Sequence, residues 1–272
     1  MASGSWEWSL SGVSRVVQLM ADIRLSVVIP AHDEAAGLAA TLEGLHTGLA
    51  ALGVSYEIIV VDNASTDATA QVAAAGNARV VHEPWRQISR ARNTGVNHAV
   101  GEWLLFVDAD TWPSRVLLES ALRYLDEGAC GGGALVAMDA LPNRVYRWGV
   151  VVWNRLARWL TLAAGCFVFV RRDAFEAIGG FDTRYYAGDE VILSRRLRRW
   201  GRAHGRSFVL IEEPPVATSA RKAAWFSPTQ HLVTVLMVVL FPPVMRSRRL
   251  MWFWYRRPGA KRGSGGGEKH TR

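Results

Sequence analysis

Apolar runs separated by helical patterns fill the first 110 residues of the chain. Five apolar residues in a row at 103–107 are typical of a strand buried on both faces of a sheet. Runs at 25–29, 56–61 and 79–82 predict three more strands. Between the first two runs, leucines recur at spacings of four and three residues, which predicts a helix with one apolar stripe. This stripe consists of Leu38, Leu42, Leu45, Leu49 and Leu52.

Two further helices complete an alternation of strand and helix. Residues 65–67 predict a turn and N-cap before an alanine-rich helix, and residues 89–99 predict another helix that ends before Gly101. Strands and helices that alternate through short loops form βαβ units with right-handed crossovers. The expected fold class is therefore α/β, with a Rossmann-like, mostly parallel sheet flanked by helices.

Beyond residue 114 the pattern is less regular. We expect a glycine loop at 131–133 and a helix with many aromatic residues at 143–164. The other expected elements are helices that end near 127 and span 189–200, and strands at 134–138 and 166–170. A chain of 272 residues buries one good core, which predicts one domain with an appendage.

The formal net charge of +8 is concentrated near the C-terminus. Residues 221–272 contain 11 Lys and Arg and one acid, whereas residues 1–220 contain 21 basic and 23 acidic residues, a net charge of −2. Such a basic segment suits nucleic acid or an anionic membrane. Because no helix-turn-helix, zinc-finger or RNA-binding signature accompanies it, we expect no nucleic acid and favour a membrane surface.

The most apolar stretch, residues 232–245, lies inside this basic segment. A bilayer crossing needs about 20 such residues, and Pro242-Pro243 interrupts a helix near its end. Arginines and tryptophans follow at 246–257, a mixture typical of segments that lie on an anionic membrane rather than cross it. A helix that covers the domain's own core is the alternative.

These patterns divide the chain and suggest its compartment. The predicted parts are a leader, amphipathic or disordered, at 1–23, the α/β domain at 24–220, a helical, membrane-surface segment at 221–257 and a disordered tail at 258–272. The leader lacks the basic start and continuous apolar stretch of a signal peptide. The only cysteines, Cys130 and Cys166, are expected to be buried thiols of a reducing compartment. We expect a cytoplasmic protein, free or peripheral on the inner face of the cell membrane.

Acidic residues follow three of the predicted strands. Asp108 and Asp110 follow the strand at 103–107. They are not expected in the core, because an unpaired buried charge is costly. The ends of strands in open α/β sheets are also where ligands bind. Hard oxygen ligands held close together suit Mg²⁺ or Mn²⁺ that carries a phosphate group. A turn or a helix cap before Trp112-Pro113 is the structural alternative.

The other two acidic sites are expected at the same edge of the sheet. Asp33 and Glu34 follow the first strand, and Asp62 ends the second. No G-x-G-x-x-G follows the first strand, and no Walker phosphate loop is present. A nucleotide at this edge would therefore need a metal for its phosphates and carboxylates for its base and ribose.

Five blocks of the sequence resemble family 2 glycosyltransferases in their order and spacing. The blocks are SVVIPAHDE, IIVVDNASTDAT, ARNTGVNHAVGEWLLFVDADTWP, GCFVFVRRDAFEAIGGFD and GDEVILSRRLRRWG. They cover roughly residues 24–205, most of the chain. The resemblance implies the GT-A fold and transfer of a sugar from a nucleotide donor.

For the donor, the resemblance implies contacts at the first two strands. In such enzymes the backbone of Pro30 and Ala31 cradles the nucleotide base, and Glu34 lies beside it. Asp62 then accepts a hydrogen bond from the base, commonly uracil. An ionised carboxylate is a strong acceptor for a ring N–H. A turn-capping role is the alternative for Asp62, although Asp67 suits that role better.

For the leaving diphosphate, the resemblance implies cations. Arg90, or else Arg86, matches the basic loop that contacts the pyrophosphate, with a solvated helix face as the alternative. Asp108 resembles a ribose or indirect metal contact, and Asp110 resembles the direct ligand of Mg²⁺ or Mn²⁺. Such a cation stabilises the charge that develops on the departing phosphate oxygens.

For the acceptor, the resemblance implies a carboxylate base. Glu190 matches the base and Asp189 its acidic neighbour, but their order is reversed relative to the usual pair, which keeps Asp189 as the alternative base. An N-cap and a first-turn acid are their structural roles. His231 lies where some relatives place a further metal ligand. Tyr146, Trp148, Trp153 and Trp159 are expected either to line the acceptor site or to pack in the core.

The sequence thus predicts an inverting, metal-dependent hexosyltransferase. Its expected donor is a nucleotide sugar, most simply a UDP-sugar, and its expected acceptor is a carbohydrate or a lipid-linked molecule. A sugar-phosphate nucleotidyltransferase is the alternative enzyme, disfavoured because residues 30–34 lack a glycine-rich basic loop. A catalytically silent binding module is disfavoured by the presence of Asp108, Asp110 and Glu190.

Overall fold

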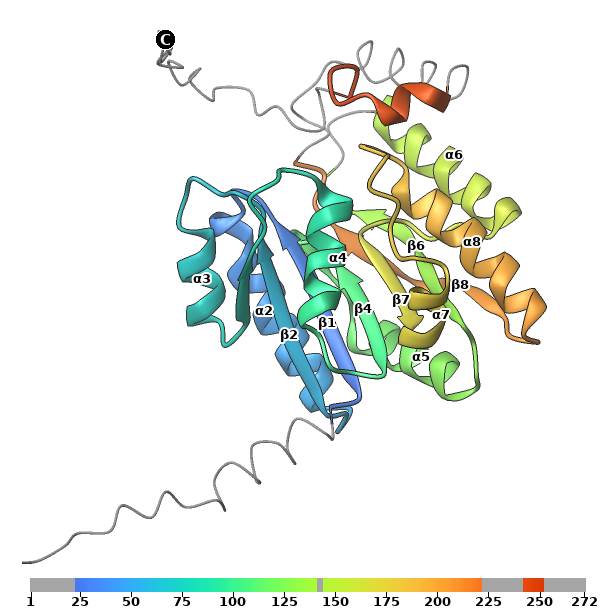
Figure 1. Ribbon diagram of the computed structural model, residues 1–272, viewed down its shortest axis with the longest axis horizontal. Coiled ribbons are helices and arrows are strands. Elements are labelled where there is room, and N and C mark those ends of the chain that lie inside the picture. The colour runs from blue at the N-terminus through green and yellow to red at the C-terminus, as the bar shows by residue number, and fades with distance from the viewer. Residues whose placement is uncertain (1–22, 141–143, 222–241, 252–272) are drawn as a thin grey trace, which may run out of the picture.

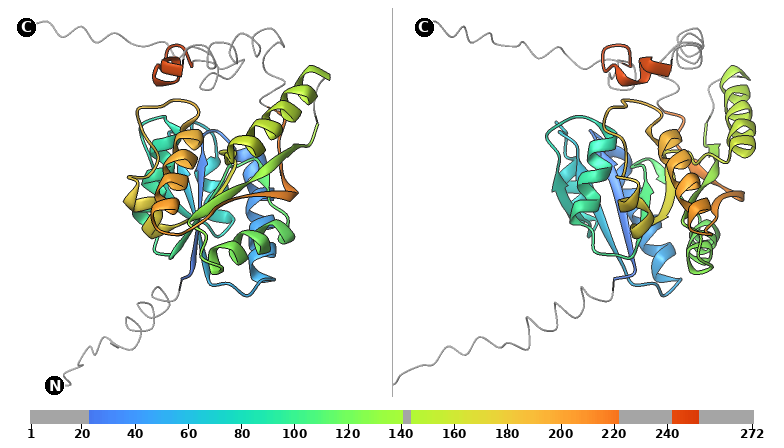
Figure 2. Two further views of the ribbon diagram at one scale, coloured as in Figure 1. Left: turned by 90° about the vertical axis from the view of Figure 1, so that its right-hand side faces the viewer. Right: turned by 45° about the vertical axis from the view of Figure 1, so that its right-hand side comes forward.

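A computed structural model describes residues 23–140, 144–221 and 242–251 of the chain (Figure 1). Its centre is an eight-stranded sheet in the order β3-β2-β1-β4-β7-β6-β8-β5. The strands are β1 (Leu25–Ala31), β2 (Tyr56–Asp62), β3 (Arg79–His82), β4 (Trp103–Val107), β5 (Thr111–Trp112), β6 (Gly131–Met138), β7 (Phe167–Arg171) and β8 (Phe208–Thr218). The helices are α2 (Ala35–Ala50), α3 (Thr69–Ala75), α4 (Ile88–His98), α5 (Arg115–Asp126), α6 (Arg144–Leu160), α7 (Arg172–Ala177) and α8 (Asp189–Ala203). Helices lie on both faces of the sheet, as the turned views show (Figure 2).

The N-terminal half is the predicted parallel unit. Strands β1, β2, β3 and β4 pair in parallel, and α2, α3 and α4 connect them. The apolar runs and the leucine stripe therefore predicted the right elements. Because neighbouring parallel strands end at one edge, the carboxyl ends of β1, β2 and β4 lie together.

The C-terminal half makes the sheet mixed. Strand β7 is antiparallel to both β4 and β6, whereas β6 and β8 are parallel. The short β5 closes the edge by pairing antiparallel with β8. The sheet is therefore mixed and flanked by helices, which agrees with the expected α/β class.

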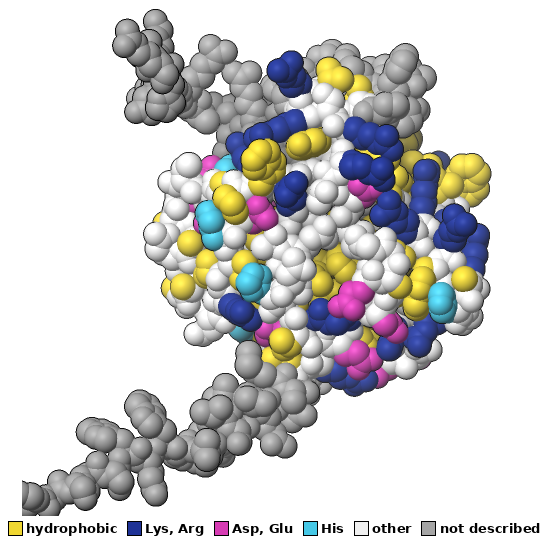
Figure 3. All heavy atoms as spheres, in the orientation of Figure 1, with side chains coloured by type: hydrophobic (Ala, Val, Ile, Leu, Met, Phe, Trp, Pro, Cys, Tyr) yellow, Lys and Arg dark blue, Asp and Glu magenta, His cyan; other side chains and the backbone are white. Residues whose placement is uncertain are grey.

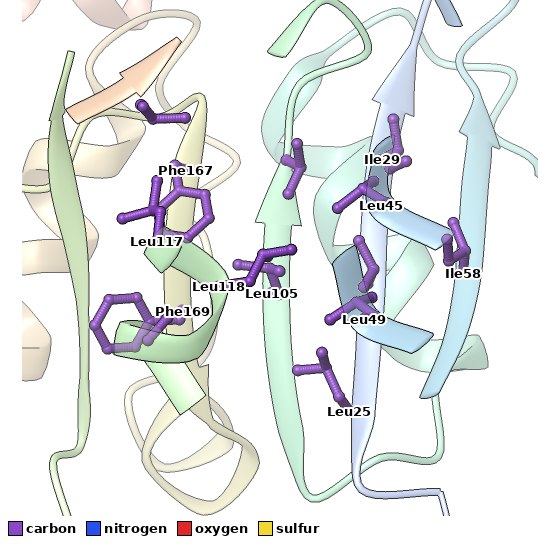
Figure 4. Close-up of a cluster of buried hydrophobic side chains, with 14 of the residues drawn as sticks. Leu25, Ile29, Leu45, Leu49, Ile58, Leu105, Leu117, Leu118, Phe167 and Phe169 are labelled. Carbon is purple, nitrogen blue, oxygen red and sulfur yellow. The ribbon is translucent and has the colours of Figure 1, made fainter. Parts of the chain in front are cut away.

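Two apolar layers hold the helices against the sheet. On one face, Val27 and Ile29 of β1 pack with the α2 stripe and with Leu117 and Leu118 of α5 (Figure 4). On the other face, Val28 packs in a cluster with residues of α4, α7 and α8. Alternate residues of β1 thus enter opposite layers, as expected for a strand buried on both faces.

The expected glycine loop at 131–133 is instead the first part of β6. A Cβ on Gly132 would lie 2.2 Å from the Val209 carbonyl oxygen and 2.4 Å from the Phe169 ring. These glycines let β6 fit between β7 and β8, where no side chain has room. The prediction was wrong because glycine is typical of loops as well as of close backbone approach.

Strand β8 was not predicted from the sequence. It contains Glu212-Glu213-Pro214-Pro215, a run that argues against a strand because proline lacks the backbone donor. The pairing with β6 is interrupted between Ala134 and Val136, so the prolines lie in an irregularity of the ladder. The missing backbone N–H groups of the prolines therefore interrupt no regular hydrogen-bonded pair of the ladder.

The turn at 65–67 differs in detail from the expected N-cap. Residue Ala68 occupies the N-cap position of α3. Asp67 instead accepts hydrogen bonds from the backbone N–H of Thr69 at 3.0 Å and of Ala35, the first residue of α2, at 3.2 Å. Asp67 therefore ties the starts of two helices together.

The described C-terminal segment is a short 3-10 helix, η2 (Pro242–Arg246), followed by a turn to Met251. Among the described residues, no helix is both long and apolar enough to span a bilayer. Residues 1–22 of the expected leader at 1–23, His231, most of the apolar stretch at 232–245 and the tail lie outside the described residues.

Candidate active site

The acidic side chains predicted to converge do follow adjacent strands of the sheet. Glu34 precedes α2 just after β1, Asp62 ends β2, and Asp108 and Asp110 follow β4. Ala31 of β1 is in register with Asp62, and the Ala31 carbonyl accepts a hydrogen bond from the Asn63 N–H at 2.7 Å. The edge is therefore lined by carboxylates on a rigid backbone.

Asp62 is buried and performs a turn role as well. Its Oδ1 accepts from the Ser65 N–H at 3.1 Å, and its Oδ2 lies 3.4 Å from Nδ1 of His82. The structural alternative given for Asp62 thus exists in the fold. A carboxylate oxygen accepts more than one hydrogen bond, so a turn contact leaves room for a ligand.

The segment Asp108-Ala109-Asp110 is a turn between β4 and β5. The Asp108 N–H donates to the Cys166 carbonyl at 3.3 Å, and the Thr111 N–H donates to the Asp108 carbonyl at 3.1 Å. The Asp110 carbonyl accepts from Ser219, just after β8, at 3.0 Å. The following helix, α5, is capped by Ser114 and not by the aspartates.

Glu34 and Asp110 face one guanidinium, that of Arg221. Arg221 Nη2 lies against Glu34 Oε2 and 3.6 Å from Asp110 Oδ2, and both carboxylates are buried. Two buried carboxylates around one guanidinium bring several oxygen donors to this edge of the sheet. Arg221 reaches this place because β8 ends beside Asp110.

A second buried arginine, Arg92, joins the donor edge to α8. Its Nη2 is 3.1 Å from Asp108 Oδ1 and donates to the Gly165 carbonyl at 2.7 Å, while its Nη1 is 3.1 Å from Asp189 Oδ2. Burial lowers the pKa of the guanidinium, but Asp189 and Asp108 outweigh burial and leave this pKa raised. Arg92 is therefore a fixed positive charge between the two acids.

The predicted base lies beside this arginine. Gly188 is the N-cap of α8, and Asp189 and Glu190 form its first turn, so Asp189 is not the N-cap. Asp189 is buried against Arg92, whereas Glu190 is half-buried. A Cβ on Gly165 would lie 3.1 Å from Arg92 Nη2 and 3.5 Å from Glu190 Oε2, so Gly165 lies next to both side chains.

The surroundings of Glu190 favour the protonated form of its carboxyl group. Burial raises the pKa of Glu190, the negative charge of Asp189 raises it further, and Arg92 opposes the shift. A carboxylate with a raised pKa accepts a proton more readily near neutral pH. Of the two acids predicted as bases, Glu190 is the one whose carboxylate is not committed to the arginine.

The two candidate diphosphate contacts lie near the start of α4. Arg90 is exposed, its Nε donates to Gln87 Oε1 at 3.1 Å, and its guanidinium lies 5.8 Å from the centre of the Trp85 ring. Arg86 is half-buried. The described contacts of Arg90 do not include the acids of the edge. Its position therefore fits both a contact with the diphosphate and a solvated helix face.

The aromatic residues of α6 divide into two groups. Trp153 packs against the core, whereas Trp148 and Trp159 are exposed to solvent. Tyr146 is half-buried. Helical spacing alone could not separate these groups, and Trp153 follows the core interpretation.

The residues at the edge fit a divalent cation. Within the described ranges no three His, Cys, Asp or Glu side chains form a complete cage. Mg²⁺ is typically held by one or two carboxylates together with the phosphates of a substrate, and the edge offers Asp110 and Asp108 as oxygen donors. The chemistry of these oxygen donors, with Asp110 buried beside Arg221, supports this fit.

Comparison with known proteins identifies the family. The model of "Glycosyl transferase family 2" matches residues 26–179, more than half of the chain. The chain is a family 2 glycosyltransferase. This confirms the resemblance that the five sequence blocks carried.

Two relatives place this glycosyltransferase among known sequences. It is 28% identical over 191 residues to the glycosyltransferase AglE of Haloferax volcanii, covering 63% of this chain and 60% of AglE. It is 30% identical over 176 residues to a PGL/p-HBAD biosynthesis glycosyltransferase of Mycobacterium bovis, covering 61% of this chain and 66% of that protein. The chain thus spans less than two thirds of the length of these relatives.

Two solved structures share the fold. A mannosyltransferase of Pyrobaculum calidifontis, solved with GDP-Man and Mn²⁺, superposes with a TM-score of 0.57 at 23% identity. The superposition covers 86% of this chain and 66% of the mannosyltransferase chain. Glucosyl-3-phosphoglycerate synthase of Mycobacterium tuberculosis, solved with Mn²⁺, UDP-glucose and phosphoglyceric acid, superposes with a TM-score of 0.55 at 19% identity, covering 89% and 86%.

Three features of this glycosyltransferase site could not be predicted from the sequence: the burial of Arg92, the contacts of Arg221 with Glu34 and Asp110, and the position of η2. Arg92 lies in the ARN block, but an arginine within a helix gives no sign that it will be buried between acids. Segment η2 covers the loop before α8, where the Tyr186 N–H donates to the Met245 carbonyl at 2.7 Å and Met245 lies against Gly188. Cys130 is buried as expected, whereas Cys166 is only half-buried beside the site.

Proposed function

We propose that this protein transfers a hexosyl group from a nucleotide sugar to a carbohydrate or lipid-linked acceptor, with metal dependence and inversion of configuration. The observation that carries the proposal is the arrangement around Arg92. This arginine contacts Asp108 at the donor edge and Asp189 next to Glu190. A donor at the edge and an acceptor at Glu190 would then meet on one rigid frame.

For the donor, we propose a UDP-sugar. Asp62 would accept the hydrogen bond from the uracil N–H, with the backbone of Pro30 and Ala31 and the side chain of Glu34 around the base. Asp108 would contact the ribose and Arg90 the diphosphate. Fold relatives solved with UDP-glucose and with GDP-Man support a nucleotide sugar, and they leave uridine and guanosine donors to be compared by experiment.

For the metal, we propose Mg²⁺ or Mn²⁺ held by Asp110, with Asp108 as the second oxygen donor. His231, the further candidate ligand, lies outside the described residues. When bound, the cation would neutralise charge on the leaving diphosphate as a Lewis acid. Fold relatives solved with Mn²⁺ support the use of a divalent cation.

For the reaction, we propose a single displacement with Glu190 as base. The acceptor hydroxyl would lose its proton to the Glu190 carboxylate while its oxygen attacks the anomeric carbon, and the bond from that carbon to the diphosphate oxygen would break. Because no second carboxylate nucleophile is needed, the product would have inverted configuration. Asp189 would hold Arg92 rather than act as base, since its carboxylate is buried against the guanidinium.

For the location, we propose a cytoplasmic protein that is peripheral on an anionic membrane through the segment 221–257. The net charge of residues 221–272, with 11 basic residues and one acid, supports this role.

The donor is tested by thermal stabilisation. A panel of UDP- and GDP-sugars is added to the full chain with Mn²⁺, and the melting temperature is followed. A ligand at about 100 times its Kd adds about 2.7 kcal/mol, which corresponds to roughly 5–10 °C for a domain of this size. The anomeric configuration of the product, read by proton NMR, then tests inversion. Absence of any shift and of any sugar transfer across the panel contradicts the proposal.

A further inference from the structure

Helix α6 exposes an apolar stripe to solvent. Trp148 and Trp159 are 67% and 81% exposed, and Val151, Val152 and Leu156 between them are 40%, 60% and 39% exposed. These positions recur at helical spacing, so they share one face of the helix. Single exposed apolar residues are ordinary on a protein surface, but five on one face of one helix mark an interaction site.

The opposite face of α6 is anchored to the domain. Ala157 is buried and Trp153 packs against the core cluster. Asn154 of α6 exchanges two hydrogen bonds with the backbone of Val136 in β6, at 3.1 and 2.9 Å. The stripe is therefore held outward by a fixed helix, and rotation of α6 cannot bury it without breaking these contacts.

The charge of α6 is entirely positive. The helix contains four arginines, Arg144, Arg147, Arg155 and Arg158, and no acidic residue. Arg158 pairs with Glu212 of β8 at 2.8 Å, and the other three are exposed. Arginines beside exposed tryptophans suit the headgroup region of an anionic lipid layer, where indoles lie at the interface and arginine heads reach phosphates.

The position of α6 suits such a surface. The ribbon views place α6 at the periphery, at the end of the sheet opposite α3 (Figures 1 and 2). Segment η2 and one end of α6 lie at the same end of the molecule, the end toward which β1, β2 and β4 point. The turn after η2 adds exposed Arg248 and Arg249 there. In the space-filling view, apolar and basic side chains adjoin at the margin where α6 runs (Figure 3).

We propose that α6 docks on an anionic lipid surface, with the stripe from Trp148 to Trp159 in the headgroup region and its arginines on lipid phosphates. A second copy of the chain fits less well, because two facing α6 helices would bring arginines together without an acid on either. The inference rests on the proposed peripheral location and deepens it by assigning α6, in addition to segment 221–257, to the lipid contact; it depends on neither donor nor metal.

The experiment measures partition of the full chain onto vesicles of phosphatidylcholine with phosphatidylglycerol by co-sedimentation. The variant Arg147→Gln/Val152→Ser removes one cation and one apolar contact from the stripe. The matched control Arg115→Gln/Val116→Ser makes the same changes on α5, where Val116 is 58% exposed. Both variants lose the same net charge, so the C-terminal basic segment contributes equally to each.

We expect the α6 variant to bind about tenfold more weakly than the control, since one cation near an anionic surface accounts for about fivefold and the apolar contact for the rest. Trp148→Ser/Trp159→Ser should weaken binding similarly with an unchanged melting temperature, because both indoles are exposed. Binding of both α6 variants equal to that of the control overturns the proposal. So does a loss of dimers in light scattering of the α6 variants without vesicles, which would identify a second copy as the partner.

Discussion

Replacing Arg92 by methionine tests the frame that joins the two halves of the site. The arginine is 2% exposed and its Asp189 partner 3% exposed, so this ion pair is isolated from water. Methionine keeps the apolar stem and removes the charge together with the hydrogen bond to the Gly165 carbonyl. Asp189 is then left as a buried carboxylate without its cation.

The size of the effect follows from that isolation. Removing one partner of a buried pair costs about 3–5 kcal/mol, because the remaining charge keeps its desolvation penalty. At about 2–4 °C per kcal/mol for a domain of this length, the melting temperature should fall by roughly 6–20 °C. Asp108 contributes less, since its side chain is 22% exposed and water partly solvates it.

The assay is urea unfolding of three variants at neutral pH. Arg196→Met is the matched control, because Arg196 also pairs with an aspartate, Asp182 at 2.8 Å, but is 36% exposed. A surface pair contributes about 0–1 kcal/mol, so this control should be close to the wild type. In Arg92→Met/Asp189→Asn the unpaired charge is gone, and much of the lost free energy of unfolding should return.

Two results would refute this reasoning. The first is a free energy of unfolding for Arg92→Met within about 1 kcal/mol of the Arg196→Met control, which would mean that the pair is not desolvated. The second is no recovery in the double variant, which would assign the loss to packing rather than to charge.

Three other sites give measurable outcomes. Burial and Asp189 raise the pKa of Glu190 from 4.5 to about 8, so the protonated form stabilises the fold fully below pH 4.5 and this contribution is lost as the pH rises to about 8. In urea unfolding, Glu190→Gln should lack this decline of the free energy of unfolding with pH. A pH dependence identical to that of the wild type would contradict the raised pKa. Asp110→Asn should weaken Mn²⁺ binding in calorimetry about tenfold or more, whereas exposed Asp126→Asn should not; equal affinities would remove Asp110 from the metal site. Gly132→Ala should lower the free energy of unfolding by about 1–3 kcal/mol, whereas Gly44→Ala, in open space on α2, should raise it by about 0.5–1 kcal/mol; the reverse order would contradict the packing of β6.

The parallel half of the fold could be predicted because its signals are local. The strand at 103–107 is buried on both faces, and α2 is buried on one. A continuous apolar run and a leucine repeat are the respective signs of this burial, and both are visible within a short stretch of sequence. The aspartates at the ends of β2 and β4 were placed at one edge for the same reason, since parallel neighbours end together. The family motifs then added Glu190 from a distant segment.

The remaining features depend on contacts between distant segments. The glycines of β6 are typical of a loop until β7 and β8 lie on either side, and the prolines of β8 argue against a strand until the ladder is interrupted there. Arg92 and Arg221 contact acids far away in the sequence, and nothing in their own neighbourhood distinguishes them from solvated arginines. The exposed stripe of α6 likewise can be told apart from its core face only when the packing of the helix on the domain is known.

The central claim is that Glu190 removes the acceptor proton while the acids of the sheet edge hold the donor. It is tested most directly by release of nucleoside diphosphate from the nucleotide sugar that stabilises the protein, with Mn²⁺ and acceptor at saturation. Glu190→Gln should lose about 10²–10⁴-fold in kcat with unchanged donor affinity, and exposed Glu43→Gln should match the wild type. Turnover of Glu190→Gln at the wild-type rate would contradict the account.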